Sequence, residues 1–153
     1  QADFNLPERF ALEYVASDGQ RKRPIMLHRA LFGSVERFFG VLVEHFAGNF
    51  PAWLAPVQAA VLPVAAEYQA YAEKVAAELA AGGVRVEISE ALDPLGKRMR
   101  NAKTQKLPYI LGVGESDVSA GTVGVNPRGG DVERDVPLAS FAQRLLGEIE
   151  ARV

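Results

Sequence analysis

The chain contains no cysteine and only two histidines among its 153 residues. Without cysteine it can form no disulfide scaffold, has no cysteine nucleophile and cannot complete a cysteine-based zinc finger within itself. A zinc site needs three or four nitrogen, sulfur or oxygen ligands, so two histidines argue against a complete site made by this chain alone. A metal role for either histidine would need ligands that this chain lacks.

The sequence also lacks long apolar runs and a strong net charge. No run approaches the roughly 18 apolar residues of a membrane span, and the polar start at residues 1–9 has no hydrophobic region of a signal peptide. Seventeen basic and nineteen acidic side chains give a formal net charge of −2, so the whole-molecule field does not indicate a nucleic-acid binder, although a local patch can still exist. We expect a cytoplasmic globular protein, and a fragment, because the chain starts at Gln1 rather than at a methionine.

Two structural elements and a linker are predicted in the first part of the chain. Alternating residues before Asp18-Gly19 and the run at residues 24–28 predict a β-hairpin. Residues 33–46 have the length of a helix and end before a glycine and a proline. This helix is apolar almost all round, which predicts burial on several sides. Residues 48–56 hold two prolines and the only tryptophan, and we interpret them as a linker between two units.

From residue 57 onward the pattern alternates between strands and helices. Strands are predicted at residues 57–62, 84–88, 109–113 and 122–125. Helices are predicted at residues 65–81, 94–106 and 137–152, and a turn at residues 114–121. This β-α-β-α-β-β-α order predicts an α/β layer with a mainly parallel sheet and one antiparallel strand.

The second of these helices is locally basic and has no acidic residue between positions 97 and 106. Lys97, Arg100, Lys103 and Lys106 recur every three residues and form a ridge along one side of the helix, with Arg98 between them. One interpretation is a surface that contacts phosphate or RNA. The other is a solvated helix face, because exposed lysines are common on helices, and the pattern alone leaves both open.

Two further candidates lie in the first part of the chain. His28, at the end of a predicted strand, is either a structural histidine or one ligand of a metal. Glu36 and Arg37 lie in an otherwise apolar helix, where buried charges need partners. They either form an internal ion pair or direct Arg37 toward a ligand. The fork of an arginine suits the oxygens of a triphosphate.

Residues Arg23–Gly48, RPIMLHRALFGSVERFFGVLVEHFAG, resemble motif 3 of the threonyl-tRNA synthetases with its preceding strand. Gly33-x-x-Glu36-Arg37 matches the core of class II motif 3, and the FPAWLAPVQ that follows resembles this family's junction into its anticodon-binding domain. The resemblance covers essentially the whole chain. It implies that residues 1–50, with the β-hairpin and the motif 3 strand and helix, are the end of a class II antiparallel catalytic domain. Residues 51–153 would be an α/β anticodon-binding domain with a five-stranded mixed sheet and three helices.

By position, the resemblance implies roles for three residues of the first unit. Arg37 would hold the γ-phosphate of ATP during adenylate formation, and Ser34 would contact ATP or the adenylate. His28 would complete the catalytic Zn²⁺ site, whose other ligands, a cysteine and a histidine, are not in this chain. In this family zinc binds the amino group and hydroxyl of threonine, and a site built to ligate a hydroxyl rejects an analogue that lacks it. The implied substrates are threonine, ATP with Mg²⁺ and tRNA(Thr), and the intact enzyme would be a homodimer.

In the second unit the resemblance favours RNA contact by the basic ridge. The implied anticodon-binding residues are Lys97, Arg98, Arg100, Lys103, Lys106, Asp117 and Arg128. Three positions depart from the family: Leu92 replaces an asparagine that reads an anticodon base in bacterial relatives, and Asn126 and Asp131 replace basic residues. An apolar side chain cannot supply a base-edge hydrogen bond. Anticodon recognition is therefore either rerouted through the remaining basic residues or weaker, and our hypothesis is rerouting.

The resemblance thus implies that the chain is part of a threonine–tRNA ligase, which joins threonine to tRNA(Thr) at the expense of ATP. The fragment alone is expected to be inactive, because the motif 2 arginine, most of the zinc site and the dimer interface lie elsewhere. The alternative is a non-catalytic synthetase-like paralogue that acts as an RNA-binding or regulatory module. The departures from the family pattern support that alternative, whereas the retention of His28 and Arg37 argues against it.

Overall fold

The computed structural model describes residues 1–153, which pack as two units, Gln1–Val41 and Leu42–Val153. The division falls inside helix α2 (Val35–Phe46), which carries the chain from one unit into the next. The sequence resemblance places the boundary between the catalytic and anticodon-binding domains after residue 50. That boundary stays a prediction, because the division between Val41 and Leu42 describes packing only. None of the helices has the length and apolar character needed to span a membrane.

The first unit contains two small antiparallel strand pairs. Strand β1 (Ala2–Asp3) pairs with β4 (Met26–Leu27), and β2 (Tyr14–Val15) pairs with β3 (Arg21–Lys22). Helix α1 (Asn5–Arg9) follows β1 almost at once. The antiparallel character predicted for this part of the chain is therefore present in both pairs.

The predicted hairpin forms around Asp18-Gly19, but its second strand is not the predicted run of residues 24–28. The Asp18 carboxylate accepts a hydrogen bond from the Gln20 amide at 3.0 Å, and Gly19 has a left-handed φ of 76°. The turn therefore closes at once, and the return strand is β3. Pro24 has no N–H to donate to a ladder, and the residues beyond it pair with β1 instead.

Helix α2 shows none of the burial that was predicted for it. It has no buried residue, and Phe39 is 59% exposed. The prediction of burial on several sides is wrong for this chain, because no other element packs closely against the helix. Leu42 and Phe46 are half-buried, and the other apolar side chains of the helix are exposed to solvent.

The second unit is built on a five-stranded mixed sheet in the order β6-β5-β7-β8-β9. Strands β6, β5 and β7 are parallel, and β8 runs antiparallel to both of its neighbours. The predicted mixed sheet with one reversed strand is confirmed. The strands are β5 (Ala59–Pro63), β6 (Val86–Ile88), β7 (Tyr109–Val113), β8 (Thr122–Pro127) and β9 (Glu133–Pro137).

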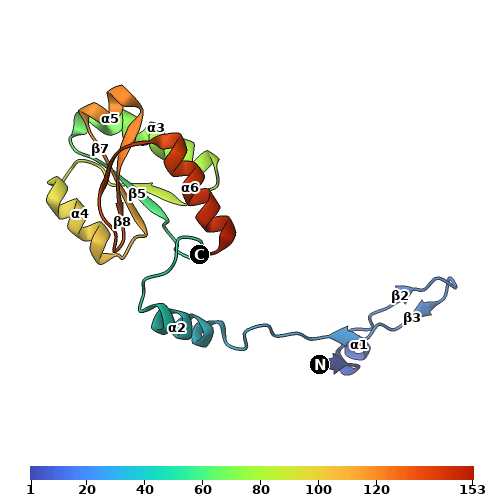
Figure 1. The fold of residues 1–153 in the computed structure, drawn as a ribbon. Helices are drawn as coiled ribbons and strands as arrows, with labels where there is room; N and C mark the ends of the chain where they lie inside the picture. Colours follow the sequence, from blue (N-terminus) through green and yellow to red (C-terminus); the bar gives the residue numbers. More distant parts are fainter. The chain divides into compact units, whose positions relative to one another are not determined.

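Helices cover both faces of this sheet (Figure 1). Helices α3 and α6 pack with the sheet around one buried cluster, and α4 packs on the opposite face around a second cluster. The alternation of strand β5 serves both clusters, because Ala59 and Val61 face the first while Ala60 and Leu62 face the second. The helices are η1 (Ala66–Tyr68), α3 (Gln69–Ala81), α4 (Leu95–Thr104), α5 (Glu115–Ala120) and α6 (Leu138–Ala151).

The short helix α5 replaces the turn that was predicted at residues 114–121 and adds a fourth α-helix to the three expected in this unit. Its amino end is capped by Asp117, whose Oδ2 accepts the Gly114 amide hydrogen at 3.0 Å. Its carboxyl end stops at Gly121, which has a left-handed φ of 69°. The two glycines that indicated a turn therefore mark the two ends of a helix.

Candidate functional site

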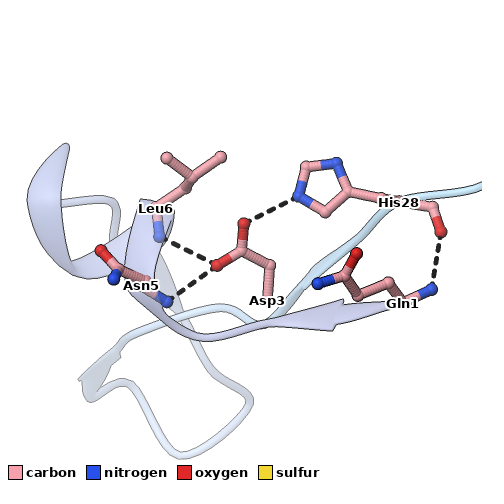
Figure 2. Close-up of polar contacts among 5 residues, drawn as sticks. All are labelled: Gln1, Asp3, Asn5, Leu6 and His28. Atoms are coloured by element: carbon pink, nitrogen blue, oxygen red, sulfur yellow. Dashed lines mark hydrogen bonds and ion pairs between the residues drawn. The ribbon is translucent and has the colours of Figure 1, made fainter.

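His28 forms a hydrogen-bonded pair with Asp3 across the β1–β4 ladder (Figure 2). Asp3 stands opposite Met26, and His28 lies two residues after Met26, just past the end of β4, so both side chains share one face of the pair. The Asp3 Oδ2 and His28 Nε2 atoms are 2.8 Å apart. The other carboxylate oxygen, Oδ1, accepts the amide hydrogens of Asn5 at 2.9 Å and Leu6 at 3.1 Å.

These contacts fix the carboxylate of Asp3 more firmly than the imidazole. The amide hydrogen bond from Leu6, followed by the hydrogen bond from His28, lowers the pKa of Asp3. The Asp3 side chain is 16% exposed, whereas that of His28 is 45% exposed. His28 therefore keeps an accessible ring whose Nε2 has a carboxylate partner, an arrangement that metal-bound histidines commonly show.

The chain does not supply a complete zinc site. No three residues among its histidines, aspartates and glutamates come together as a metal-binding group. A zinc site needs three or four ligands, and His28 offers one imidazole. The pair with Asp3 fits a single ligand position, and the residues of this chain do not fit a whole site.

Ser34, Glu36 and Arg37 lie at the amino end of α2. Ser34 Oγ donates to Glu36 Oε2 at 2.9 Å and accepts the Arg37 amide hydrogen at 3.3 Å, so it caps the helix. The backbone amide of Glu36 and then the Ser34 hydroxyl lower the pKa of Glu36. The Arg37 side chain is exposed and forms neither a hydrogen bond nor an ion pair. The ion pair considered for Glu36 and Arg37 therefore does not form, and the guanidinium is free.

Three cations of the basic ridge on α4 are exposed, and two of them have no partner. Lys97 Nζ lies 2.9 Å from Asp93 Oδ2, an exposed ion pair one turn away. Arg100 and Lys103 form no side-chain hydrogen bond or ion pair. Solvent-exposed cations without partners are available to a phosphate backbone, so these two are the strongest RNA-contact candidates.

Arg98 does not belong to this exposed surface, although it was expected to contact RNA. Its side chain points inward, and the residue is 5% exposed. The guanidinium donates to three backbone carbonyls: those of Asp93 at 2.8 Å, Ser89 at 3.0 Å and Pro63 at 2.8 Å. Arg98 therefore ties α4 to the ends of β5 and β6 and is a structural residue.

Lys106 and Arg128, two other expected RNA contacts, are exposed and bind backbone carbonyls in this structure. Lys106 follows α4 with a left-handed φ of 58°, and its Nζ donates to the Ala47 carbonyl. The Arg128 guanidinium donates to the carbonyls of Lys106 at 2.6 Å, Phe50 at 2.8 Å and Asn49 at 3.1 Å. Partial burial lowers the pKa of Arg128.

Asp117 is the remaining predicted RNA contact, and both of its carboxylate oxygens are already in use. One accepts the Gly114 amide hydrogen, and the other accepts the Thr122 hydroxyl hydrogen at 2.9 Å. Its observed role is to cap α5 and to join that helix to the start of β8.

A pocket of about 290 Å³ lies beside the exposed cations, between the end of α4 and the loop after β8. Its apolar residues suit the face of a base, while Asn126 and Lys103 bring a hydrogen-bonding amide and a cation. Sequence reasoning did not single out the apolar residues, because strand alternation marks Ile110 only as a core residue. The pocket is lined by Lys103, Leu107, Ile110, Asn126, Pro127, Arg128, Gly129 and Gly130.

Comparison with family models matches most of the chain. The model described as "Anticodon binding domain" matches residues 58–148. The model described as "tRNA synthetase class II core domain (G, H, P, S and T)" matches residues 1–46. The basic ridge and the pocket lie within the first of these ranges, and His28, Ser34 and Arg37 lie within the second.

Curated relatives and a solved structure point the same way. The chain is 51% identical over 152 residues to the threonine–tRNA ligase of Thermobifida fusca, and 56% identical over 153 residues to that of Acidithiobacillus ferrooxidans. These matches cover 99% and 100% of this chain but only 23% and 24% of the relatives. The crystal structure of the RNA-binding domain of threonyl-tRNA synthetase from Cryptosporidium parvum superimposes with a TM-score of 0.71 at 33% identity. That match covers 96% of this chain and 37% of the other.

Proposed function

The chain belongs to the anticodon-binding domain family, and from this membership we propose that it is part of a threonine–tRNA ligase. In the longer enzyme, residues 51–153 would bind the anticodon region of tRNA(Thr), and residues 1–50 would belong to the catalytic core. That enzyme would activate threonine with ATP and transfer it to tRNA(Thr). We expect it to act as a homodimer in the cytoplasm and this chain alone to be inactive.

The observation that carries the RNA-binding proposal is the pair of free cations beside the pocket. Arg100 and Lys103 are exposed and unpaired, and Lys103 also lines the pocket. Cations on a ridge can contact successive phosphates, while an adjacent apolar pocket with an amide can hold an unstacked base. This combination suits a single-stranded loop better than a duplex, because the bases of a loop can leave the stack.

Fewer residues than expected are available for the alternative mode of anticodon recognition. Leu92 is 88% exposed and offers no hydrogen bond to a base. Arg98 and Arg128 are occupied by backbone carbonyls, which leaves Lys97, Arg100 and Lys103 for the phosphates. We propose that Asn126 in the pocket supplies the base contact, because its amide both donates and accepts.

In the first unit we propose that Arg37 contacts the γ-phosphate of ATP and that Ser34 lies near the nucleotide. An unpaired guanidinium can bind phosphate oxygens in a bidentate way and offset the charge that Mg²⁺ leaves uncompensated. His28 would supply one imidazole nitrogen to a zinc site that other residues of the longer enzyme complete. When bound, the metal would hold the amino and hydroxyl groups of threonine.

The binding proposal can be tested with the 153-residue chain and a labelled transcript of the tRNA(Thr) anticodon stem-loop. Fluorescence anisotropy should show that the double variant R100A/K103A binds about tenfold or more weakly, with a salt slope shallower by about 1.4, since each phosphate contact on single-stranded RNA contributes about 0.7 to that slope. The control is K74A, which removes an exposed lysine without a partner on α3. Equal binding by R100A/K103A, K74A and the wild type would refute the proposed interface.

A further inference from the structure

Two residues at the edge of the pocket hold the linker that follows α2. Arg128 lines the pocket beside Lys103 and also donates to the Asn49 and Phe50 carbonyls. Lys106, at the end of the basic helix, donates to the Ala47 carbonyl and accepts from Arg128 through its own carbonyl. Residues 47–50, where the linker begins, are thus joined to Arg128 in the pocket and to Lys106, which precedes the pocket residue Leu107.

The geometry of Arg128 separates this role from phosphate binding. Its Nη1 contacts Lys106, and its Nη2 contacts both linker carbonyls, so both amino groups of the fork are committed to backbone. Only Arg has the planar fork that can reach carbonyls of two separate segments at once, whereas Lys presents a single point charge. An RNA phosphate would have to use the remaining N–H groups of Nε and Nη1 or displace these bonds.

We propose that Arg128 is a positioning residue that couples occupation of the pocket to the order of the linker at residues 47–50. Lys106 completes this linker clamp. The inference rests on the proposed function, because it takes the anticodon loop as the ligand of the pocket. RNA that settles between α4 and the loop after β8 would hold Arg128 in place and thereby stiffen the linker, and an ordered linker would favour RNA binding to the same extent.

The free protein provides the first test. Hydrogen exchange of the Gly48 and Asn49 amides should become about tenfold or more faster in both R128Q and R128K, since charge-assisted hydrogen bonds are about twice as strong as neutral ones and Lys cannot replace the fork. The matched control is R134Q on β9, which removes an exposed arginine without a partner. Exchange in the core of β5 should stay slow in all three variants and so report that they fold. Unchanged linker exchange in R128Q would overturn the clamp.

Adding the anticodon stem-loop transcript tests the coupling. Exchange in the linker should slow in the wild type and not in R128Q, while the salt slope of R128Q should equal that of the wild type. A direct phosphate contact would instead make the salt slope shallower by about 0.7 in R128Q, and R128K would restore the wild-type slope; that result would overturn the inference. No slowing of the wild-type linker by bound RNA would also overturn it. Absence of RNA binding by the wild type would refute the proposed function, and the exchange rates of the free variants would still report on the clamp.

Discussion

Replacing Arg98 by Met should strongly destabilise the second unit. The variant keeps an unbranched apolar stem but removes the donors to three backbone carbonyls, of which the bond to Pro63 is buried. A buried carbonyl left without a donor costs about 1–3 kcal/mol. The Asp93 and Ser89 carbonyls are only partly buried, so water can partly replace the lost donor, and each adds about 0.5 kcal/mol. We therefore expect a loss of about 3 kcal/mol in the free energy of unfolding.

Urea unfolding followed by circular dichroism measures this loss, with R100M as the matched control on the exposed side of the same helix. A loss of about 3 kcal/mol corresponds to a melting temperature lower by about 12 °C for a unit of this size. R100M should stay within about 0.5 kcal/mol of the wild type, as surface substitutions do. If R98M matched R100M in stability, the three hydrogen bonds would not be structural and the assignment of Arg98 to the fold would be refuted.

Two further predictions follow from shifted pKa values. Burial and then the hydrogen bond to Glu148 raise the pKa of Tyr109 to about 12, so the stability that this pair contributes should be complete below the ordinary tyrosine value of about 10 and be lost as the pH rises toward 12. Absorbance of tyrosinate should include a component that titrates near pH 12 and is absent in Y109F, and the lack of such a component would contradict the pair. The pKa of Asp3 is lowered from 3.8, so its contribution to the β1–β4 pairing should be present above that value and be lost as the pH falls further below it. In nuclear magnetic resonance spectra D3N should show the same loosening around His28 at neutral pH, and an unchanged His28 ring would count against the pair.

Much of the second unit is predictable because apolar periodicity reflects burial directly. The strand at residues 109–113 was predicted with its observed bounds, since Ile110, Leu111 and Val113 are all buried. Strand β9 was missed because it lies at the edge of the sheet, and charged residues of the kind that protect edges interrupt its pattern. Helix α5, with six residues, is too short to show a helical period.

The first unit shows a different limit. Alternation located the extended run at residues 24–28, but it could not reveal that the partner would be β1 at the start of the chain. Pairing depends on which donors are free, and Pro24 contributes none. Similarly, the apolar surface of α2 was read correctly as apolar, but a single sequence does not say whether anything covers it.

At the candidate RNA site, the number of basic residues predicts the exposed cations less well than the position of each residue in the fold. Helical spacing puts Arg98 on the same side of α4 as Leu95 and Ala102, which lie three residues before it and four after it and pack against the sheet. That spacing could have removed Arg98 from the exposed ridge before any coordinates were known. No spacing rule could have shown that Arg128 binds the linker, because the two segments are 78 and 79 residues apart in the chain.

The electrostatic contribution of the proposed RNA interface should be small. Lys97, Arg100 and Lys103 remain exposed, and the first of them already has Asp93 as a partner. Two to three phosphate contacts on single-stranded RNA give a salt slope of only about −1.4 to −2.1, far below that of proteins that bind mainly through charge. The net charge of −2 also keeps the overall attraction of the chain to RNA phosphates weak. On the proposed interface, discrimination between RNAs would come from the pocket at Asn126 and from the order of the linker, and a substitution there should change selectivity among transcripts more than it changes salt dependence.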